Sequence, residues 1–78
     1  MTVDREGPVP VSQQVAAVLR ARIEAGEILV GRPVPSESTL MQEFGIARET
    51  ARKAVRVLRD EGLVQIVQGR GAYVTGRR

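Results

Sequence analysis

Two glycines divide the second half of the chain, and their spacing limits the fold more than any other feature does. A helical pattern that starts at Ser36 stops at Gly45, and a second helical pattern, from about residue 48 to residue 61, stops at Gly62. Two short helices joined by a tight turn that contains glycine form a helix-turn-helix arrangement. Because any helical hairpin can have this pattern, it does not by itself indicate a function.

A third helix is expected before this pair, over residues 12–25. Its apolar residues recur at spacings of three and four, with Ser12 suited to cap the start and Gly26 suited to follow the end. The second helix is expected to begin at Ser36, because a serine hydroxyl accepts an orphan N–H and Glu37 favours the positive end of the helix dipole. Prolines exclude a helix between the two, where Val34 is expected to form a very short edge strand.

The period of the sequence changes after Gly62. The stretches VQIVQ and AYVT are short and rich in β-branched residues, and Gln-Gly-Arg-Gly separates them. This pattern predicts a β-hairpin whose tip needs glycine for positive φ. The expected fold is mainly α with a small β-hairpin: a winged helix-turn-helix of three helices plus a wing. We expect a flexible arm over residues 1–10, the winged helix over 11–75, and a basic tail or the start of a linker over 76–78.

The composition removes several classes of function. The 78 residues include no cysteine and no histidine, so disulfides, Cys/His zinc sites and imidazole acid–base catalysis are excluded. The serines lack a base and fit better as caps or turn residues, so we expect neither an enzyme nor a cofactor. No stretch has the pattern of a secretory signal or the length of a membrane span, and the absence of cysteine fits a reducing compartment, so we expect a cytoplasmic protein.

Net positive charge is confined to the second half of the chain. Residues 1–44 hold four arginines against six acids, a net −2, whereas residues 45–78 hold eight basic residues against three acids, a net +5. An asymmetry of this kind is a first indication of a nucleic-acid-binding face.

The helix expected over 48–61 carries much of that charge. At 100° per residue, its four arginines (Arg48, Arg52, Arg56 and Arg59) fall within an arc of about 80° beside the apolar face. One interpretation is a solvated face on which Glu49 pairs with Lys53 and Arg56 with Asp60. However, like charges one turn apart destabilise a helix by roughly 0.2–0.5 kcal/mol per pair. Phosphates would supply the missing acids, so the pattern favours a helix that reads DNA.

The hairpin tip, Gly69-Arg70-Gly71, has three interpretations. A dinucleotide or phosphate loop would need a third glycine and a following helix, and the sequence has neither. A plain tight turn with a solvated arginine is the second. The third is a wing whose Arg70 enters the narrow minor groove of DNA. Its place directly after the arginine-rich helix favours the wing.

Taken in order, these residues resemble the N-terminal DNA-binding domain of the gluconate-repressor (GntR) family of bacterial transcription regulators. The stretch PSESTLMQEFGIARETARKAVRVLRDEGLVQIVQGRGAYV follows the family pattern through Pro-Ser-Glu, Arg-x-Thr-x-Arg, Leu-x-x-x-Gly-Leu and Gly-x-Gly. VSQQVAAVLRARIEAGEILVG resembles its first helix. The resemblance implies sequence-specific binding of double-stranded DNA at a palindromic operator, as a homodimer with one recognition helix per major-groove half-site.

The resemblance also carries site residues onto this chain. Arg48, Thr50 and Arg52 match the DNA-contacting pattern of the recognition helix, the tip matches the wing that reaches the minor groove, and Glu37 is interpreted as structural. The full set of expected DNA-binding residues is Ser36, Ser38, Arg48, Glu49, Thr50, Arg52, Lys53, Gln68, Gly69 and Arg70.

The chain departs from the family pattern at three positions. Ala47 stands where Ser or Thr is usual, which removes an N-cap worth about 1 kcal/mol. Ser38 replaces an arginine or another polar contact. Glu49 occupies a variable position that faces the bases, where it would repel phosphates but could accept from a cytosine amino group.

Family members usually continue into a larger domain that binds a small effector and dimerises. The chain is therefore expected to be either the DNA-binding part of a longer regulator, which the resemblance favours, or a short regulator on its own. Two rival functions remain: a winged helix used for protein interaction, with the arginines meeting an acidic partner, and a non-specific nucleic-acid binder.

Overall fold

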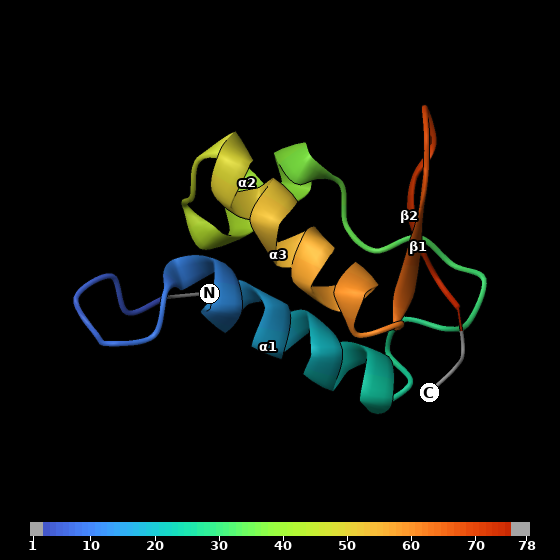
Figure 1. Ribbon diagram of the computed structural model, residues 1–78, viewed down its shortest axis with the longest axis horizontal. Helices are drawn as coiled ribbons and strands as arrows, with labels where there is room; N and C mark the ends of the chain where they lie inside the picture. The colour runs from blue at the N-terminus through green and yellow to red at the C-terminus, as the bar shows by residue number, and fades with distance from the viewer. Residues whose placement is uncertain (1–2, 76–78) are drawn as a thin grey trace.

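The computed structural model of this chain describes residues 3–75. Three helices and one hairpin follow each other as α1 (Val11–Glu24), α2 (Glu37–Phe44), α3 (Arg48–Asp60), β1 (Val64–Val67) and β2 (Gly71–Val74). In Figure 1, α1 lies beneath α3, and α2 and the hairpin stand at opposite ends of α3 on the same side of the molecule. This is the expected winged helix-turn-helix.

A side-chain hydroxyl caps the start of one of the three helices described here, and the other two begin without one. Ser36 caps α2, where its Oγ accepts the Thr39 N–H at 3.1 Å, as predicted. At α1 the prediction was wrong: the helix begins one residue before Ser12, with Pro10 at the N-cap position and no side-chain cap. The carbonyl of Pro10 accepts the N–H groups of Gln13 and Gln14 instead. At α3 the cap position is held by Ala47, in extended backbone, which offers no hydroxyl.

Glycines end the elements where the sequence indicated. Gly45 is in the left-handed region at φ 66° and ψ 41°, and its N–H donates to the Met41 carbonyl, which closes α2. Gly26 and Gly62 follow α1 and α3 with φ of 81° and 80°. Left-handed backbone costs an L-residue with a side chain about 1–2 kcal/mol, so glycine suits these exits.

The hairpin pairs β1 with β2 in antiparallel register, from Val64 opposite Val74 to Val67 opposite Gly71. Gly69 and Gly71 both have positive φ, as the hairpin pattern predicted. The expected edge strand at Val34 is reduced to a single bridge between Pro33 and Tyr73. Hydrogen bonds from residues 31–34 to β2 nevertheless hold the α1–α2 connection against the hairpin.

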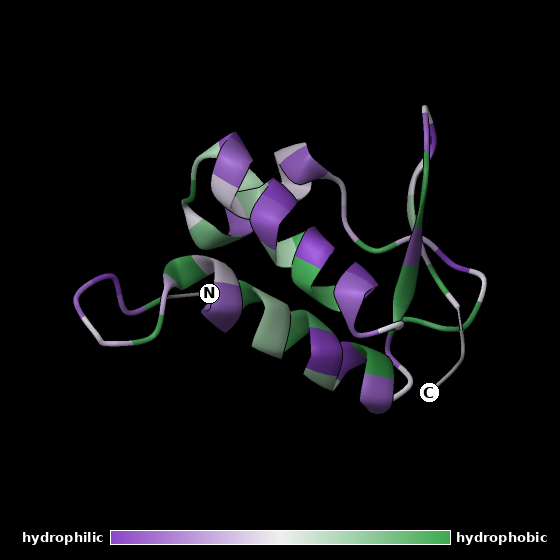
Figure 2. Ribbon diagram, in the orientation of Figure 1, coloured by the Kyte–Doolittle hydropathy of each residue, from purple (hydrophilic) through white to green (hydrophobic). Residues whose placement is uncertain are grey.

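A small apolar core lies where the elements meet. Three leucines, Leu19, Leu40 and Leu58, contribute one fully buried side chain from each helix, and Val64 and Val74 contribute from the hairpin. Figure 2 shows the resulting alternation along α3, where hydrophilic segments interrupt hydrophobic ones. The core fixes α3 between α1 and α2 and leaves its charged side on the surface.

Residues 3–10, part of the expected flexible arm, lie close to the helices. The Gln14 side chain donates to the carbonyls of Asp4 and Val9, and Arg5 donates to the carbonyl of Gly45. The mobility of this arm stays a prediction. Residues 1–2 and the expected basic tail at 76–78 lie outside the described residues.

Candidate nucleic-acid interface

The turn between α2 and α3 spans three residues and is held at both ends. Gly45 closes α2, and Ile46 is buried in the core with 6% of its surface exposed. Ala47 is exposed and leads into the first turn of α3. The short turn therefore sets how the start of α3 is presented beside the start of α2.

The arginines of α3 form one exposed row. The side chains of Arg48, Arg52, Arg56 and Arg59 are between 46% and 52% exposed. Lys53 is also exposed, and within residues 3–75 it has no carboxylate within 4.0 Å. A row of half-exposed guanidiniums on one helix can bind anions, because each guanidinium keeps several free N–H donors.

Glu37 reaches this row from the neighbouring helix. Its Oε1 accepts from Nη1 of Arg48 at 3.0 Å, and its Oε2 accepts from Nε of Arg52 at 3.1 Å. The hydrogen bond from Arg48, followed by that from Arg52, lowers the pKa of the Glu37 carboxyl against the opposing effect of partial burial. The first turns of α2 and α3 are thus joined through one carboxylate.

The ion pairs within α3 differ from those predicted. Glu49 lies 3.7 Å from Nη1 of Arg52 and 3.6 Å from Nη1 of Arg56, rather than pairing with Lys53. Asp60 pairs with its neighbour Arg59 at 3.0 Å, rather than with Arg56. Both predicted pairs were wrong, because only partners four residues apart were considered. Glu49 instead lies near arginines three and seven residues further along α3, and Asp60 pairs with the residue directly before it.

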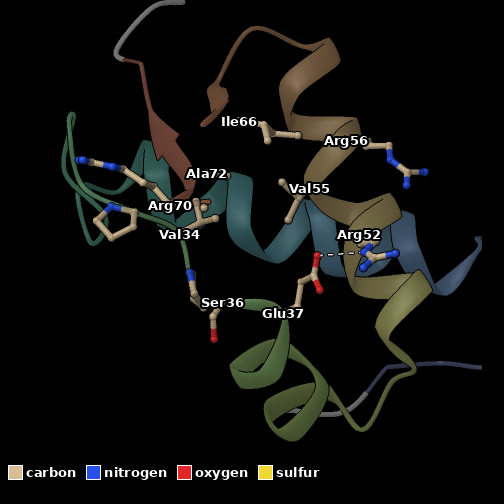
Figure 3. Close-up of a pocket in the computed structure, with 12 residues that line it drawn as sticks. Val34, Ser36, Glu37, Arg52, Val55, Arg56, Ile66, Arg70 and Ala72 are labelled. Atoms are coloured by element: carbon tan, nitrogen blue, oxygen red, sulfur yellow. Dashed lines mark hydrogen bonds and ion pairs between the residues drawn. The ribbon is translucent and has the colours of Figure 1, made fainter. Parts of the chain in front are cut away.

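The hairpin and α3 face each other across a groove of about 510 Å³, which we call the α3–hairpin groove. Arg52, Val55 and Arg56 line it from α3, Ile66, Arg70, Gly71 and Ala72 line it from the hairpin, and residues 33–37 close the third side. In Figure 3, apolar side chains surround the hollow while the guanidiniums of Arg56 and Arg70 point away from it on opposite sides. α3 and the hairpin therefore border the same groove.

The structure brings together some of the predicted site residues. Arg48, Glu49 and Arg52 all lie in the first turns of α3, Thr50 is half-buried among them, and Lys53 is exposed on the same helix. Gln68, Gly69 and Arg70 are exposed at the hairpin tip. Ser38 is exposed at the start of α2, whereas the Ser36 hydroxyl already bonds to Thr39, donating to Oγ1 at 3.0 Å and accepting from the N–H.

Two contacts of the site were not predicted. Glu37 was interpreted as structural, and its bridge to the arginines has one signal in the sequence: two like charges a turn apart lack an acid on their own helix face. Arg5, which bonds to the carbonyl that ends α2, has no such signal. Among residues 3–75 no group of three His, Cys, Asp or Glu residues could hold a metal ion, and no helix is long and apolar enough to cross a membrane.

Comparison with known proteins decides the family. A model of the family described as bacterial regulatory proteins, gntR family, matches residues 11–74, which include all three helices and the hairpin. The chain belongs to the gntR family. This membership confirms the resemblance found in the sequence, and it places the chain among transcription regulators rather than enzymes.

Individual members of the gntR family are similar along most of this chain. The repressor NagR of Bacillus subtilis is 36% identical over 75 residues, which is 96% of this chain and 31% of that protein. The mannosyl-D-glycerate repressor MngR of Escherichia coli is 39% identical, over 92% of this chain and 30% of that protein. The chain thus spans about a third of the length of these relatives.

A solved structure matches the fold over nearly its whole length. The DNA-binding domain of AraR, crystallised with an operator, has a TM-score of 0.88 and 36% identity, covering 96% of this chain and 95% of that one. The three helices and the hairpin therefore form a complete winged helix of the gntR type.

Proposed function

We propose that this chain binds double-stranded DNA sequence-specifically, as the DNA-binding domain of a bacterial transcription regulator. The observation that carries the proposal is the row of half-exposed arginines along α3, presented by a three-residue turn from α2. The similarity to the AraR domain that was crystallised with its operator supports it.

In this proposal α3 enters the major groove. Arg48 and Arg52, on its first two turns, contact base edges, because a guanidinium can bind guanine O6 and N7 with two hydrogen bonds. Glu49 accepts from a cytosine amino group and so contributes to the choice of sequence. Thr50 and Lys53 contact the DNA beside them. Arg56 and Arg59 lie farther along α3, where their partners are phosphates or the acids already described.

The hairpin acts as the wing. Its exposed tip, with Gln68, Gly69 and Arg70, reaches the minor groove, where the negative potential of a narrow groove attracts an arginine. Ser36 and Ser38 stand at the start of α2, where N–H groups and the helix dipole favour a backbone phosphate. The α3–hairpin groove supports this arrangement, because Arg52 lines it from α3 and Arg70 lines it from the hairpin.

The whole regulator is proposed to act as a homodimer on a palindromic operator. Two recognition helices then meet two half-sites about one helical turn apart, about 34–36 Å. Since the chain spans about a third of its relatives' length, we propose that a small-molecule effector, where there is one, binds a domain outside this chain. The site of action is the bacterial cytoplasm, where the nucleoid lies.

Selection from a pool of random-sequence duplexes tests the proposal. The chain is expected to enrich a defined sequence, and its affinity for that duplex should fall steeply with salt, as expected when several phosphates are neutralised. A scrambled duplex of the same composition is the control. If no sequence is enriched but binding still falls with salt, the chain is a non-specific binder. If no duplex binds at moderate salt, the arginine row serves a protein partner.

A further inference from the structure

One carboxylate joins the two arginines that the proposed function assigns to base recognition. Each oxygen of Glu37 accepts from a different arginine, Oε1 from Arg48 at 3.0 Å and Oε2 from Arg52 at 3.1 Å. The arginines lie one turn apart on α3, whereas Glu37 lies on α2. The contact therefore spans the helix-turn-helix and depends on how the two helices pack.

Glu37 is held in place by its backbone rather than by burial. It is the first residue of α2, directly after the Ser36 cap. Leu40 and Phe44 fix that helix in the core, and Ala51 fixes the facing turn of α3. The Glu37 side chain itself is 36% exposed, so the carboxylate reaches the arginines from a fixed base at the surface.

The bridge restricts the arginines without using up their donors. An arginine side chain has five N–H donors and many rotamers, and ordering such a side chain costs up to about 2 kcal/mol of entropy. Arg52 bonds to Glu37 through Nε, which leaves its two terminal nitrogens for a base edge. Arg48 bonds through Nη1, which leaves Nε and Nη2. Both guanidiniums are oriented before DNA arrives.

Glu49 does not have this role. It lies on α3 itself, its side chain is 56% exposed, and its distances to Arg52 and Arg56 are 3.7 and 3.6 Å, which are ion pairs rather than hydrogen bonds. No contact within residues 3–75 joins it to Arg48. Glu37 is therefore the acid that contacts both of the arginines assigned to base recognition.

We propose that Glu37 is a positioning residue that sets sequence discrimination by orienting Arg48 and Arg52 and by opposing attraction to phosphates at the same place. The proposal rests on the function proposed above, in which these two arginines read bases. It follows that loss of the carboxylate lowers the sequence specificity of binding, while the affinity for DNA of any sequence is kept or raised. Free arginines still attract any phosphate, and they do so more strongly without the negative charge, but they no longer meet base edges in a fixed orientation.

The test uses the full chain with the duplex enriched by the wild type and a scrambled duplex of the same composition. In Glu37→Gln, the ratio of the two affinities is expected to fall about tenfold, within the range for loss of one good base contact. The scrambled duplex should bind more tightly than it does to wild type, with a steeper dependence on salt. A merely structural role would weaken binding to both duplexes together.

Two further variants make the test specific. Glu61→Gln removes the same charge and breaks a comparable bridge, to Arg20 on α1, so it is the matched control and should leave the ratio unchanged. Glu37→Asp keeps the charge and should restore part of the ratio. Thermal unfolding of each variant, measured by circular dichroism, confirms that the fold is retained.

A double variant shows whether Glu37 acts through Arg52. If it does, Glu37→Gln has little further effect on discrimination at the base pair read by Arg52 once Arg52→Ala is present. An unchanged ratio in Glu37→Gln, or effects that simply add in the double variant, overturns the proposal. A wild type that prefers no duplex overturns the proposed function itself, and the role of Glu37 with it.

Discussion

At the scale of single residues, the arginines on the exposed face of α3 form ion pairs with neighbouring glutamates. Glu37 joins Arg48 and Arg52, and Glu49 lies near Arg52 and Arg56. In free solution these carboxylates relieve the repulsion between like charges one turn apart. Because the groups are half-exposed, each pair contributes little to stability, and their effect is on the orientation of the guanidiniums.

Arg70 is expected to contribute affinity rather than sequence preference. It is exposed at the hairpin tip, with no carboxylate within 4.0 Å among residues 3–75. Arg70→Ala should therefore weaken binding to enriched and scrambled duplexes by similar factors and reduce the salt slope by about 1. Fluorescence anisotropy over a range of salt concentrations measures both. A loss confined to the enriched duplex would show that Arg70 reads sequence.

Ala47 leaves α3 without a side-chain cap, and a hydroxyl there should stabilise the chain. The backbone of Ala47, at φ −75° and ψ 159°, already has the extended conformation that a capping serine needs. Ala47→Ser is expected to add about 1 kcal/mol to the free energy of unfolding, or about 4–8 °C to the midpoint. Ala47→Val, which lacks an acceptor, is the control. Equal midpoints for the serine and valine variants would contradict this account.

Among the elements, the connection between α2 and α3 decides what α3 presents. Gly45 turns the chain in the left-handed region, Ile46 anchors it in the core, and the Gly45 carbonyl accepts a hydrogen bond from Arg5. At the other end of α3, hydrogen bonds from residues 31–34 hold the hairpin. The helix and the wing are thus each fixed by contacts with segments distant in the sequence.

The effect of substitutions at Gly45 is expected to depend on its backbone conformation rather than on the space available for a side chain. A Cβ at this position would meet only Arg5 Nη2, at 3.6 Å, which is an ordinary contact. Gly45→Ala should nevertheless reduce the free energy of unfolding by about 1–2 kcal/mol, because φ is 66°. Gly45→Asn should lose less, since asparagine tolerates this region better. Chemical denaturation compares the two, and an alanine variant as stable as wild type would contradict the argument.

At the scale of the whole molecule, ion pairs join the helices around a small core. Arg22 bonds to Glu43 and also lies over the ring of Phe44, at 5.9 Å from its centre, which links α1 to α2. Arg20 bonds to Glu61, with Nε to Oε1 at 2.8 Å, which links α1 to the end of α3. With Glu37, three such bridges hold the three helices to one another.

These bridges predict how stability depends on pH. Hydrogen bonds from arginines lower the pKa of Glu37, Glu43 and Glu61 below the ordinary value of a glutamate. The unfolded chain therefore binds protons first as the pH falls. The stability contributed by the bridges is complete above about pH 5 and is lost as the pH falls through the folded-state pKa values.

Glu43→Gln tests this effect, because its bridge has the least exposed side chains of the three. The variant should be less stable than wild type at pH 7, by about 1 kcal/mol or less. It should lose less on acidification, so the two free energies of unfolding should converge as the pH falls through the lowered folded-state pKa of Glu43. Urea denaturation at several pH values measures this. Parallel curves would mean that Glu43 is not held by Arg22 in solution.

The sequence predicted those features that depend on residues close together in the chain. The cap at Ser36, the glycine exits and the hairpin follow from local chemistry, and the row of arginines follows from helical geometry. The contacts of Glu37 and Arg5 depend on how distant segments pack, which no local pattern contains. Rules for an isolated helix also gave the wrong partners for Glu49 and Asp60. The individual DNA contacts stay predictions, because they depend on the DNA as well as on the fold of the chain.

The central claim is that the start of α3 reads base edges, and a scan of single base pairs tests it most directly. Each base pair of the enriched duplex is replaced in turn, and its affinity is measured for wild type and for Arg52→Ala. The variant is expected to lose about 1–3 kcal/mol on the enriched duplex and to become indifferent to one base pair in each half-site, while it keeps its preferences elsewhere. If Arg52→Ala discriminates at every base pair as wild type does, α3 does not read this DNA through Arg52, and the assignment of the recognition surface is wrong.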